Sequence, residues 1–424
     1  MRFEPKVFKL GKLRVVLVKE ARESVTVRAM IGTGSREETN KEAGSAHFLE
    51  HFVFKGTRKF PKMFDVNEAV EKVGGAFNAY TGQNEMGFWV KMAKDNLPLA
   101  VEIVGQLLTE PVLPKEHFNK ERGTILEELH MYEDRPNSKA AETMVEVLYG
   151  KTNLGRPIIG TVESLEGMTV EDLRAYFEKW FVAENIIVGV VGDYGSDEEI
   201  LKLIKKEFAL LVKDERGLPK KDVFAWDKQT KPRQALVTRK LDQAAVYMGF
   251  RGLRMDHKLR YALEVANQIL GDGWMSRLLR EVREERGWAY SIGSGVDHYQ
   301  DVGDVMIGAG LPKSKLNEAV ELITEIAYGL GGSNRWQIVE EEMGVAKDTY
   351  RGRLALMFDK PEEVLGSALE DLMFEGEIRT PQEIMAKIDA VTLKEVHEVC
   401  NMIFKPENLS VAVVGNYKKL EFRI

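Results

Sequence analysis

The chain has 424 residues, of which 44% are hydrophobic, and a formal net charge of -7. This length predicts two or three domains, and the hydrophobic share is typical of a globular protein with a sizeable core. The charge argues against nucleic acid as the main partner, and the single cysteine, Cys400, excludes an internal disulfide and suits a reducing compartment.

The first 20 residues have charges scattered through them and no uninterrupted apolar stretch. We therefore expect no secretory signal at this end. No run in the chain approaches the roughly 18 apolar residues that a membrane-spanning helix needs. The sequence predicts a cytoplasmic protein with no membrane partner.

The segment Gly44–Thr57 reads GSAHFLEHFVFKGT, with two histidines four residues apart and a glutamate before the second. On a helix, His47 and His51 would lie about 40° apart around the axis, with Glu50 about 60° from His47 on the other side. All three side chains can then converge on one point, which suggests a zinc site. Chance is the competing explanation, so the rest of the chain has to supply further ligands.

The next segment with a distinctive pattern is GGAFNAYT, residues 74–81, followed by a second apolar stretch that predicts a pair of strands. Two glycines, small alternating side chains and the lack of charge favour an exposed edge strand. The competing interpretation is an interior strand of a hairpin.

A third metal ligand is expected on the helix predicted by EHFNKERGTILEELHMYEDRP, residues 116–136. Glu121 and Glu128 are seven residues apart, so they lie about 20° apart on the same face as the apolar Phe118 and Ile125. A carboxylate on an apolar face needs a partner, and a metal ion is one such partner. The pattern favours Glu128 over Glu127, about 100° away, without excluding either. An ordinary ion pair with Lys or Arg is the alternative for Glu121.

The chain contains an internal duplication. Residues 165–194 align without gaps on residues 388–417, with a constant offset of 223 (388 minus 165, and 417 minus 194). Each copy has a threonine that can cap a helix, an amphipathic helix, a Glu-Asn turn and an apolar strand. We infer an α+β fold with two homologous domains, 1–212 and 234–424, each a mostly antiparallel sheet packed with helices. The charged, Pro- and Gly-containing segment 213–233 is the predicted linker.

The second half has no H-x-x-E-H motif, so it is not a second zinc site. Its distinctive residues are Arg283 and Tyr290 in REERGWAY. Considered without further context, Arg283 is a solvated helix charge and Tyr290 an aromatic residue facing the core from a strand.

The motif HFLEH, followed downstream by ERGTILEEL, resembles the inverted zinc-binding pattern of the pitrilysin, insulinase and mitochondrial processing peptidase family, the inverzincins. The segments GGAFNAYTG, NLGRPIIGT and LLREVREERGWAYS are similar to that family too, so the resemblance covers nearly the whole chain. It implies that His47, His51 and Glu128 bind zinc and that Glu50 is the general base. It also implies that Glu121 supports the site.

For the half without metal, the resemblance implies that Tyr290 donates to the oxyanion or the scissile carbonyl and that Arg283 holds the substrate backbone. Family members of this length form two-chain clamshells. We therefore expect a homodimer in which the pair comes from the other chain, with a heterodimer of related chains as the alternative. In the family the substrate adds to the exposed strand, here through Phe77, Asn78, Ala79 and Tyr80.

The sequence thus predicts a zinc-dependent endopeptidase with one Zn2+ per chain. It would hydrolyse extended or unfolded peptides in a dimeric chamber, with a water on the zinc as nucleophile. The main rival is a non-catalytic or partner-dependent subunit of a processing-peptidase-like complex. The complete set of ligands and base opposes a non-catalytic role, and the Arg/Tyr pair opposes dependence on a different partner. A peptide-binding module with a structural zinc is opposed by the intact base.

Overall fold

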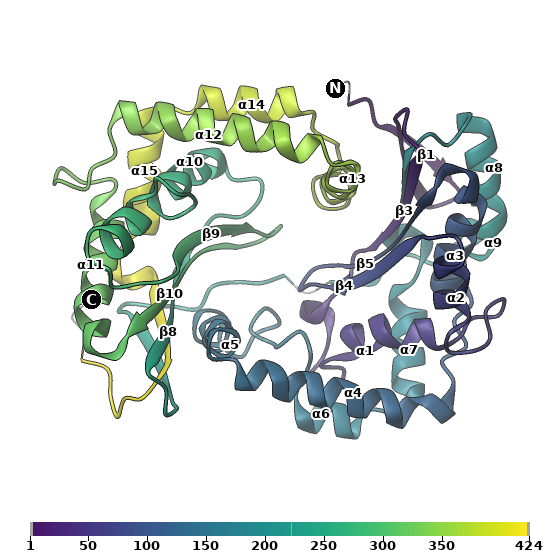
Figure 1. Ribbon diagram of the computed structural model, residues 1–424, viewed down its shortest axis with the longest axis horizontal. Helices are drawn as coiled ribbons and strands as arrows, with labels where there is room; N and C mark the ends of the chain where they lie inside the picture. The colour runs from purple at the N-terminus through teal and green to yellow at the C-terminus, as the bar shows by residue number, and fades with distance from the viewer. Residues whose placement is uncertain (1–2, 222, 422–424) are drawn as a thin grey trace. The chain divides into compact units, whose positions relative to one another are not determined.

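The computed structural model describes residues 3–221 and 223–421. Contacts within the chain divide it into two compact units (Figure 1). The first unit contains residues 1–129, 156–222 and 356–380, and the second contains residues 130–155, 223–355 and 381–424. The division at 222/223 falls within the predicted linker 213–233. None of the described helices is long and apolar enough to cross a membrane.

The first unit is built on a six-stranded sheet with the order β1-β2-β6-β3-β5-β4. Only β2 and β6 pair in parallel, and the other neighbours are antiparallel. β6 is an uninterrupted run of apolar residues and glycine, and most residues of β3 are buried as well, so both faces of the sheet centre are covered. The strands are β1 (Lys6–Leu10), β2 (Leu13–Lys19), β3 (Ser24–Ile31), β4 (Ala76–Thr81), β5 (Met86–Ala93) and β6 (Ile186–Gly192).

The second unit repeats this arrangement with five strands in the order β7-β11-β8-β10-β9. Here β7 and β11 form the parallel pair. The strands are β7 (Arg233–Thr238), β8 (Gln243–Arg251), β9 (Ile292–His298), β10 (Gly303–Pro312) and β11 (Leu409–Gly415).

The two sheets confirm the predicted α+β fold and its duplication. Strands β6 and β11 occupy equivalent places in the two sheets, and their first residues, 186 and 409, differ by the offset of 223 seen in the sequence. The helix before each strand begins at a threonine, Thr169 or Thr392, whose hydroxyl accepts from the backbone N–H three residues later. Each threonine forms a capping box, which is why the two copies start their helices at the same point.

The helices pack on the sheets from both faces (Figure 1). Those of the first unit are α1 (Ser45–Phe52), α2 (Asp65–Glu71), α3 (Leu97–Thr109), α6 (Val162–Gly167), α7 (Val170–Trp180), α8 (Asp197–Glu207), α9 (Ala209–Val212) and α13 (Pro361–Glu370). Those of the second unit are α5 (Pro136–Tyr149), α10 (Arg260–Leu270), α11 (Leu316–Gly329), α14 (Pro381–Ala390) and α15 (Leu393–Ile403). Two helices run from one unit into the other, α4 (Lys115–Asp134) and α12 (Glu340–Phe358).

Each sheet is covered on one face by a helix from the other half of the sequence. Helix α13 packs on β3 and β6 of the first sheet, and α5 packs on β8 and β11 of the second. A glycine makes room for each helix: a Cβ at Gly189 would lie 2.6 Å from a methyl carbon of Leu365, and one at Gly249 would lie 3.1 Å from the methyl carbon of Met144. The compact units therefore differ from contiguous halves of the chain, and the independence of domains 1–212 and 234–424 stays a prediction.

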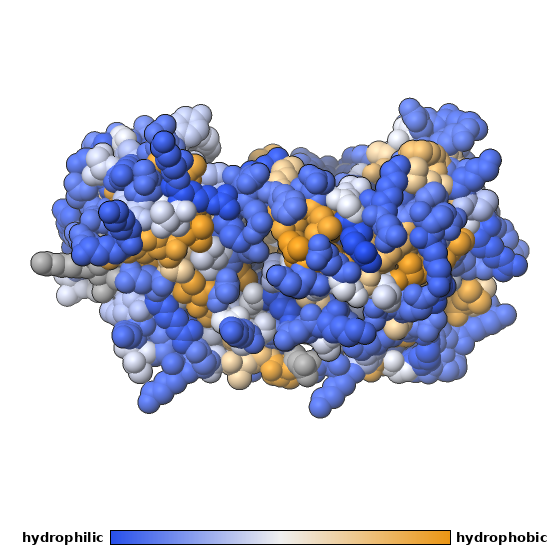
Figure 2. Space-filling model, turned by 90° about the horizontal axis from the view of Figure 1, so that it is seen from below, coloured by the Kyte–Doolittle hydropathy of each residue, from blue (hydrophilic) through white to orange (hydrophobic). Residues whose placement is uncertain are grey.

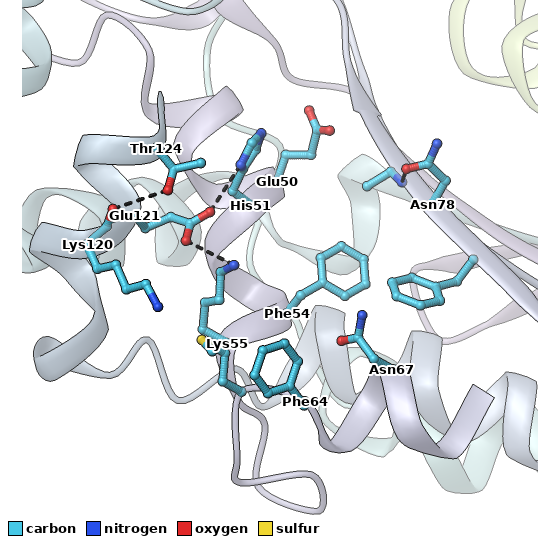
Figure 3. A pocket seen from close by; sticks show the side chains of 13 residues that line it. Glu50, His51, Phe54, Lys55, Phe64, Asn67, Asn78, Lys120, Glu121 and Thr124 are labelled. Carbon is cyan, nitrogen blue, oxygen red and sulfur yellow. Dashed lines mark hydrogen bonds and ion pairs between the residues drawn. The ribbon is translucent and has the colours of Figure 1, made fainter. Parts of the chain in front are cut away.

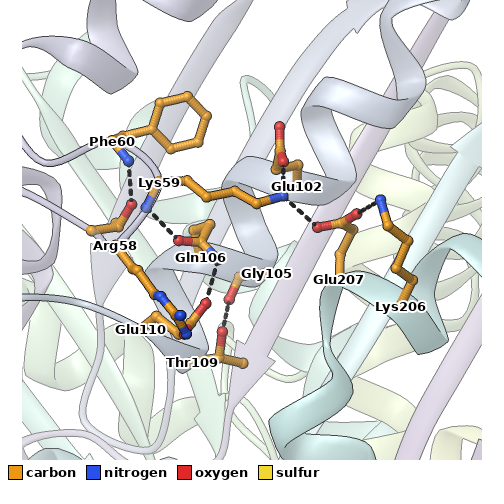
Figure 4. Close-up of polar contacts among 11 residues, drawn as sticks. Arg58, Lys59, Phe60, Glu102, Gly105, Gln106, Thr109, Glu110, Lys206 and Glu207 are labelled. Carbon is orange, nitrogen blue, oxygen red and sulfur yellow. Dashed lines mark hydrogen bonds and ion pairs between the residues drawn. The ribbon is translucent and has the colours of Figure 1, made fainter.

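A polar network anchors the turn that follows α1 (Figure 4). The backbone N–H of Lys59 donates to the side-chain oxygen of Gln106 at 2.9 Å. The Lys59 ammonium pairs with Glu102 of α3 and, at 3.3 Å, with Glu207 of α8. Exposed ion pairs contribute little stability, whereas an unpaired buried amide costs about 1–3 kcal/mol. The buried Gln106 is therefore the main anchor of this turn.

The face of the molecule drawn in Figure 2 is largely hydrophilic, with hydrophobic residues in separate patches. Charged residues make up 30% of the chain, which accounts for this surface. A few large hydrophobic side chains are nevertheless more than three-quarters exposed. Among the described residues these are Trp274 (77%), Met275 (81%), Tyr290 (83%) and Val223 (81%). The first three belong to residues 274–290 of the second unit, and Tyr290 is a member of the predicted Arg/Tyr pair.

Candidate active site

Helix α1 carries both histidines and is fixed at its start and on its inner face. The buried carboxylate of Glu38 accepts hydrogen bonds from the backbone N–H groups of Gly44 and Ala46, both at 2.8 Å. These N–H groups would otherwise be unpaired at the start of the helix. On the inner face, the ring of Phe48 stacks on Phe118 of α4, with 4.9 Å between ring centres. Helix α1 is thereby held against the helix that carries the glutamates of the site.

Side chains from α1 and α4 converge on one point. The potential ligand atoms of His47, His51 and Glu128 all lie within 4.8 Å of one another. Oε2 of Glu128 is 3.8 Å from Nε2 of His47 and 3.5 Å from Nε2 of His51. Glu127, the alternative left open by the pattern, is exposed on the same helix and is not part of this group. The helical phase of α4 therefore separates the two glutamates.

The donor atoms fit a tetrahedral metal ion such as zinc. Bonds of about 2.0–2.2 Å at tetrahedral angles place neighbouring ligand atoms roughly 3.3–3.6 Å apart. The distances of 3.5 and 3.8 Å from Glu128 to the two imidazoles are close to this spacing, and all three ligand atoms lie within 4.8 Å of one another, so a small adjustment of the side chains would complete the fit. If all three residues bind a metal ion, a fourth position is left for water, as in catalytic rather than structural zinc sites.

The surroundings act in opposite directions on the two imidazoles, which both have to be neutral to bind a metal ion. Burial and then the proximity of His51 lower the pKa of His47 to about 3, so this imidazole is neutral. Burial acts in the same direction on His51, but the hydrogen bond to Glu121 and the nearby carboxylates outweigh it and raise the pKa. Burial also raises the pKa of Glu50, against the opposing effect of a hydrogen bond from Thr81.

Glu121 contacts Nδ1 of His51, whereas Glu128 lies near Nε2 of the same ring. Oε1 of Glu121 lies 3.1 Å from Nδ1 of His51, and its other oxygen pairs with the ammonium of Lys55 at 2.9 Å. A proton on Nδ1 directs the free Nε2 of His51 towards Glu128. Glu121 thus contacts His51 and also forms an ion pair with a lysine, and its role in orienting a metal ligand stays a prediction.

Glu50 lies beside the group of three, and Thr81, the last residue of β4, holds it. The Thr81 hydroxyl donates to Oε2 of Glu50 at 2.7 Å. Sequence analysis did not single out Thr81 for this contact, because it joins residues 31 positions apart. The alternation along β4 was the available signal, since it puts Thr81 on the same face as Phe77 and Ala79.

A pocket of about 450 Å³ opens beside Glu50 and His51. Figure 3 shows aromatic rings along one side of it and the Glu121–Lys55 ion pair on the other. The pocket is lined by residues from α1 and the turn after it, the loop before α2, α2, β4 and α4. The side chains that line it include Phe54, Lys55, Met63, Phe64, Asn67, Phe77, Asn78, Ala79, Lys120 and Thr124.

The predicted strand of residues 76–81 is β4, and it forms one edge of the first sheet. In the described part of the chain it pairs with β5 alone. Phe77, Asn78 and Ala79 line the pocket. The side chain of Tyr80 points to the other face of the sheet, where its hydroxyl accepts a hydrogen bond from Arg28 at 2.7 Å and burial raises its pKa to about 12. Of Tyr80, only the backbone can contact a peptide on the pocket side of β4.

Arg283 and Tyr290 lie together in the second unit. Arg283 is in the π-helical turn η5 (Leu279–Glu284), and its guanidinium is 5.8 Å from the centre of the Tyr290 ring. Tyr290 precedes β9 and is 83% exposed, so it is not the core-facing strand residue that the bare pattern suggested. The same guanidinium lies 5.7 Å from the ring of Trp274, which the sequence analysis missed. An exposed tryptophan has no sequence signature of its own.

Two family models match this chain. The one described as Insulinase (Peptidase family M16) covers residues 14–162, and the one described as Peptidase M16 inactive domain covers residues 167–332. The chain is 29% identical to YmxG of Bacillus subtilis over 92% of its own length and 93% of the relative's. It is 30% identical to a Mycobacterium leprae protein over 96% and 90% of the two lengths. Both relatives are named uncharacterized zinc proteases.

Solved structures share the fold over the whole chain. A protease from Helicobacter pylori matches with a TM-score of 0.88 and 22% identity, covering 97% of this chain and 100% of that one. A peptidase M16 inactive domain from Pseudomonas fluorescens matches with a TM-score of 0.89 and 18% identity, covering both chains completely. The family models, the zinc protease relatives and the fold lead to one conclusion: this chain belongs to the insulinase family of peptidases, family M16.

Proposed function

We propose that this protein is a zinc-dependent endopeptidase that cleaves extended or unfolded peptides. The observation that carries the proposal is the convergence of His47, His51 and Glu128 within 4.8 Å, next to the half-buried carboxylate of Glu50. Membership of a family whose relatives are named zinc proteases supports it. The single buried cysteine fits a reducing location such as the cytoplasm.

His47, His51 and Glu128 would hold the zinc ion. When bound, zinc supplies Lewis-acid chemistry: it polarises the peptide carbonyl and lowers the pKa of a water molecule towards about 7. Glu50 accepts a proton from the attacking water and passes it to the leaving amine. Thr81 keeps one oxygen of Glu50 in place by its hydrogen bond, which fixes the direction of the carboxylate.

The free edge of β4 and the adjoining pocket are suited to an extended peptide. An edge strand offers backbone N–H and C=O groups that a peptide can pair with, so affinity depends little on sequence. The aromatic rings of Phe54, Phe64 and Phe77 offer an apolar surface for a side chain of that peptide. This combination favours an endopeptidase with modest side-chain preference.

We further propose a homodimer in which the partner subunit's Arg283 and the partner subunit's Tyr290 contact the substrate at each zinc site. Tyr290 would donate to the scissile carbonyl or the oxyanion, and Arg283 would hold the peptide backbone. The high exposure of Tyr290 and its contact with Arg283 support a role at a surface that meets another molecule.

Mixed dimers test this arrangement. We expect Glu50→Gln dimers and Arg283→Ala dimers each to have little activity, whereas each mixed dimer should regain one of its two sites, about half the activity of a wild-type dimer. In the mixed dimer one site has its own Glu50 and the other subunit's Arg283. The rate of peptide cleavage after exchange of subunits measures this. No recovery in a verified mixed dimer would mean that both residues act within one chain.

Removing the support of a ligand should weaken metal binding. We expect Glu121→Gln to lower zinc affinity about 10- to 100-fold, as is typical when the partner of a ligating histidine is changed. Titration with a competing chelator measures this affinity. The matched control is Glu127→Gln on the same helix, which is exposed and should bind zinc as tightly as the wild type. Equal affinity in all three proteins would contradict the role of Glu121.

Metal removal tests the proposed function itself. We expect the purified protein to cleave a mixed library of unstructured peptides, to lose this activity with a chelator, and to regain it with zinc. Mass spectrometry of the products reports the cleavage sites. Cleavage that persists without metal would overturn the proposal.

A further inference from the structure

The second unit has a strongly exposed tryptophan. Trp274 is 77% exposed, although tryptophan is highly buried on average. It lies in the short turn of residues 271–275 between α10 and η5. A large ring left in water without a packing role is a candidate for a contact with another group.

Side-chain and backbone contacts hold the turn that carries Trp274. Arg353 forms an ion pair with Asp272 at 2.8 Å and donates to Gln268 at 3.0 Å. The backbone N–H of Gly271 donates to the carbonyl of Asn267 at 2.9 Å, which ties the turn to the end of α10. These contacts tie the start of the turn, next to Trp274, to α10 and α12.

The guanidinium of Arg283 lies near the ring of Trp274. It lies 5.7 Å from the centre of the Trp274 ring and 5.8 Å from the centre of the Tyr290 ring. Both distances are within the roughly 6 Å over which a cation is attracted to an aromatic ring. The only ion pair seen for Arg283 in the described chain is at 3.3 Å with the exposed Glu284. Two aromatic rings therefore lie within reach of this guanidinium, in addition to its ion pair with Glu284.

We propose that Trp274 is a positioning residue that holds Arg283, together with Tyr290, in the conformation that binds the peptide backbone. The inference rests on the proposed function, in which Arg283 contacts the substrate. A free arginine side chain has many rotamers, and ordering it on binding costs affinity. A guanidinium already held by two rings has lost much of this freedom before the peptide arrives.

A double-mutant cycle in the zinc-loaded Glu50→Gln protein tests this without interference from cleavage. The readout is the Kd of a fluorescein-labelled unstructured peptide, measured by anisotropy. We expect Trp274→Leu to raise Kd about 2- to 5-fold, the size of an exposed cation–π contact, and Trp274→Phe to restore most of the affinity. In an Arg283→Ala background, Trp274→Leu should have no further effect, because Trp274 acts through Arg283.

Met275→Ala is the matched control: Met275 is the equally exposed neighbour in the same turn. We expect its effect on Kd, whatever its size, to be the same with and without Arg283. The inference is overturned if Trp274→Leu leaves Kd unchanged, or if it raises Kd equally in the Arg283→Ala background. If the Glu50→Gln protein with Trp274 intact binds no peptide at all, the proposed function fails, and the inference fails with it. The high exposure of Trp274 keeps loss of folding from mimicking these results.

Discussion

Replacing Glu50 by glutamine is expected to lower kcat for peptide hydrolysis about 10²- to 10⁴-fold, the usual contribution of a general base. Glutamine has nearly the same shape and can still meet the Thr81 hydroxyl, but its amide cannot accept the proton of the attacking water. Because Glu50 is not among the three converging ligands, the variant should keep its metal. Cleavage rates with saturating peptide and metal analysis of the same sample check both expectations.

The control for this variant is its thermal stability compared with that of the wild type. Glu50 is half-buried and makes one hydrogen bond to Thr81, so the thermal midpoint should move little. A Glu50→Gln protein that retains zinc and fold yet cleaves at the wild-type rate would remove Glu50 from the chemistry. A variant that loses its zinc would mean that Glu50 is a ligand.

Separating the two halves of the chain is expected to abolish folding of each. Residues 1–212 alone lack α13, whose Val364, Leu365 and Leu369 are buried and which packs on β3 and β6. Burying side chains of this kind stabilises by about 1.5–3 kcal/mol each, and three of them approach the whole stability of a small domain. The free sheet face would also invite aggregation.

Expression of residues 1–222 and 223–424 separately and together measures this. We expect each piece alone to be insoluble or to lack a cooperative thermal transition, and the two together to form a soluble complex. The co-expressed pair serves as the control, since it has the same sequence apart from the cut. A cooperative transition in the isolated first piece would show that 1–212 is an independent domain after all.

Much of the candidate site follows from local rules in the sequence. The spacing of His47 and His51 puts both rings on one side of a helix whatever the rest of the fold does. The phase of α4 separates the exposed Glu127 from Glu128 for the same reason. The constant offset of 223 between the repeats predicts that β6 and β11 are equivalent, and they occupy equivalent places in the two sheets.

The features that the sequence did not reveal are contacts between distant segments. Glu38 caps α1 without leaving a pattern in the sequence, and the alternation along β4 gives the face of Thr81 but not its partner Glu50. The same applies to α13, because an apolar helical face does not say which sheet it will cover. Trp274 is similar, since its relation to Arg283 depends on a turn and a π-helical segment together.

The most direct test of the account is a zinc titration of the metal-free protein in which bound metal and peptide cleavage are measured on the same samples. The account predicts that cleavage rises with bound zinc and stops rising at one ion per chain, while Glu50→Gln binds the same amount and does not cleave. Zinc that binds at one ion per chain without producing any cleavage would contradict the account and point instead to a non-catalytic subunit.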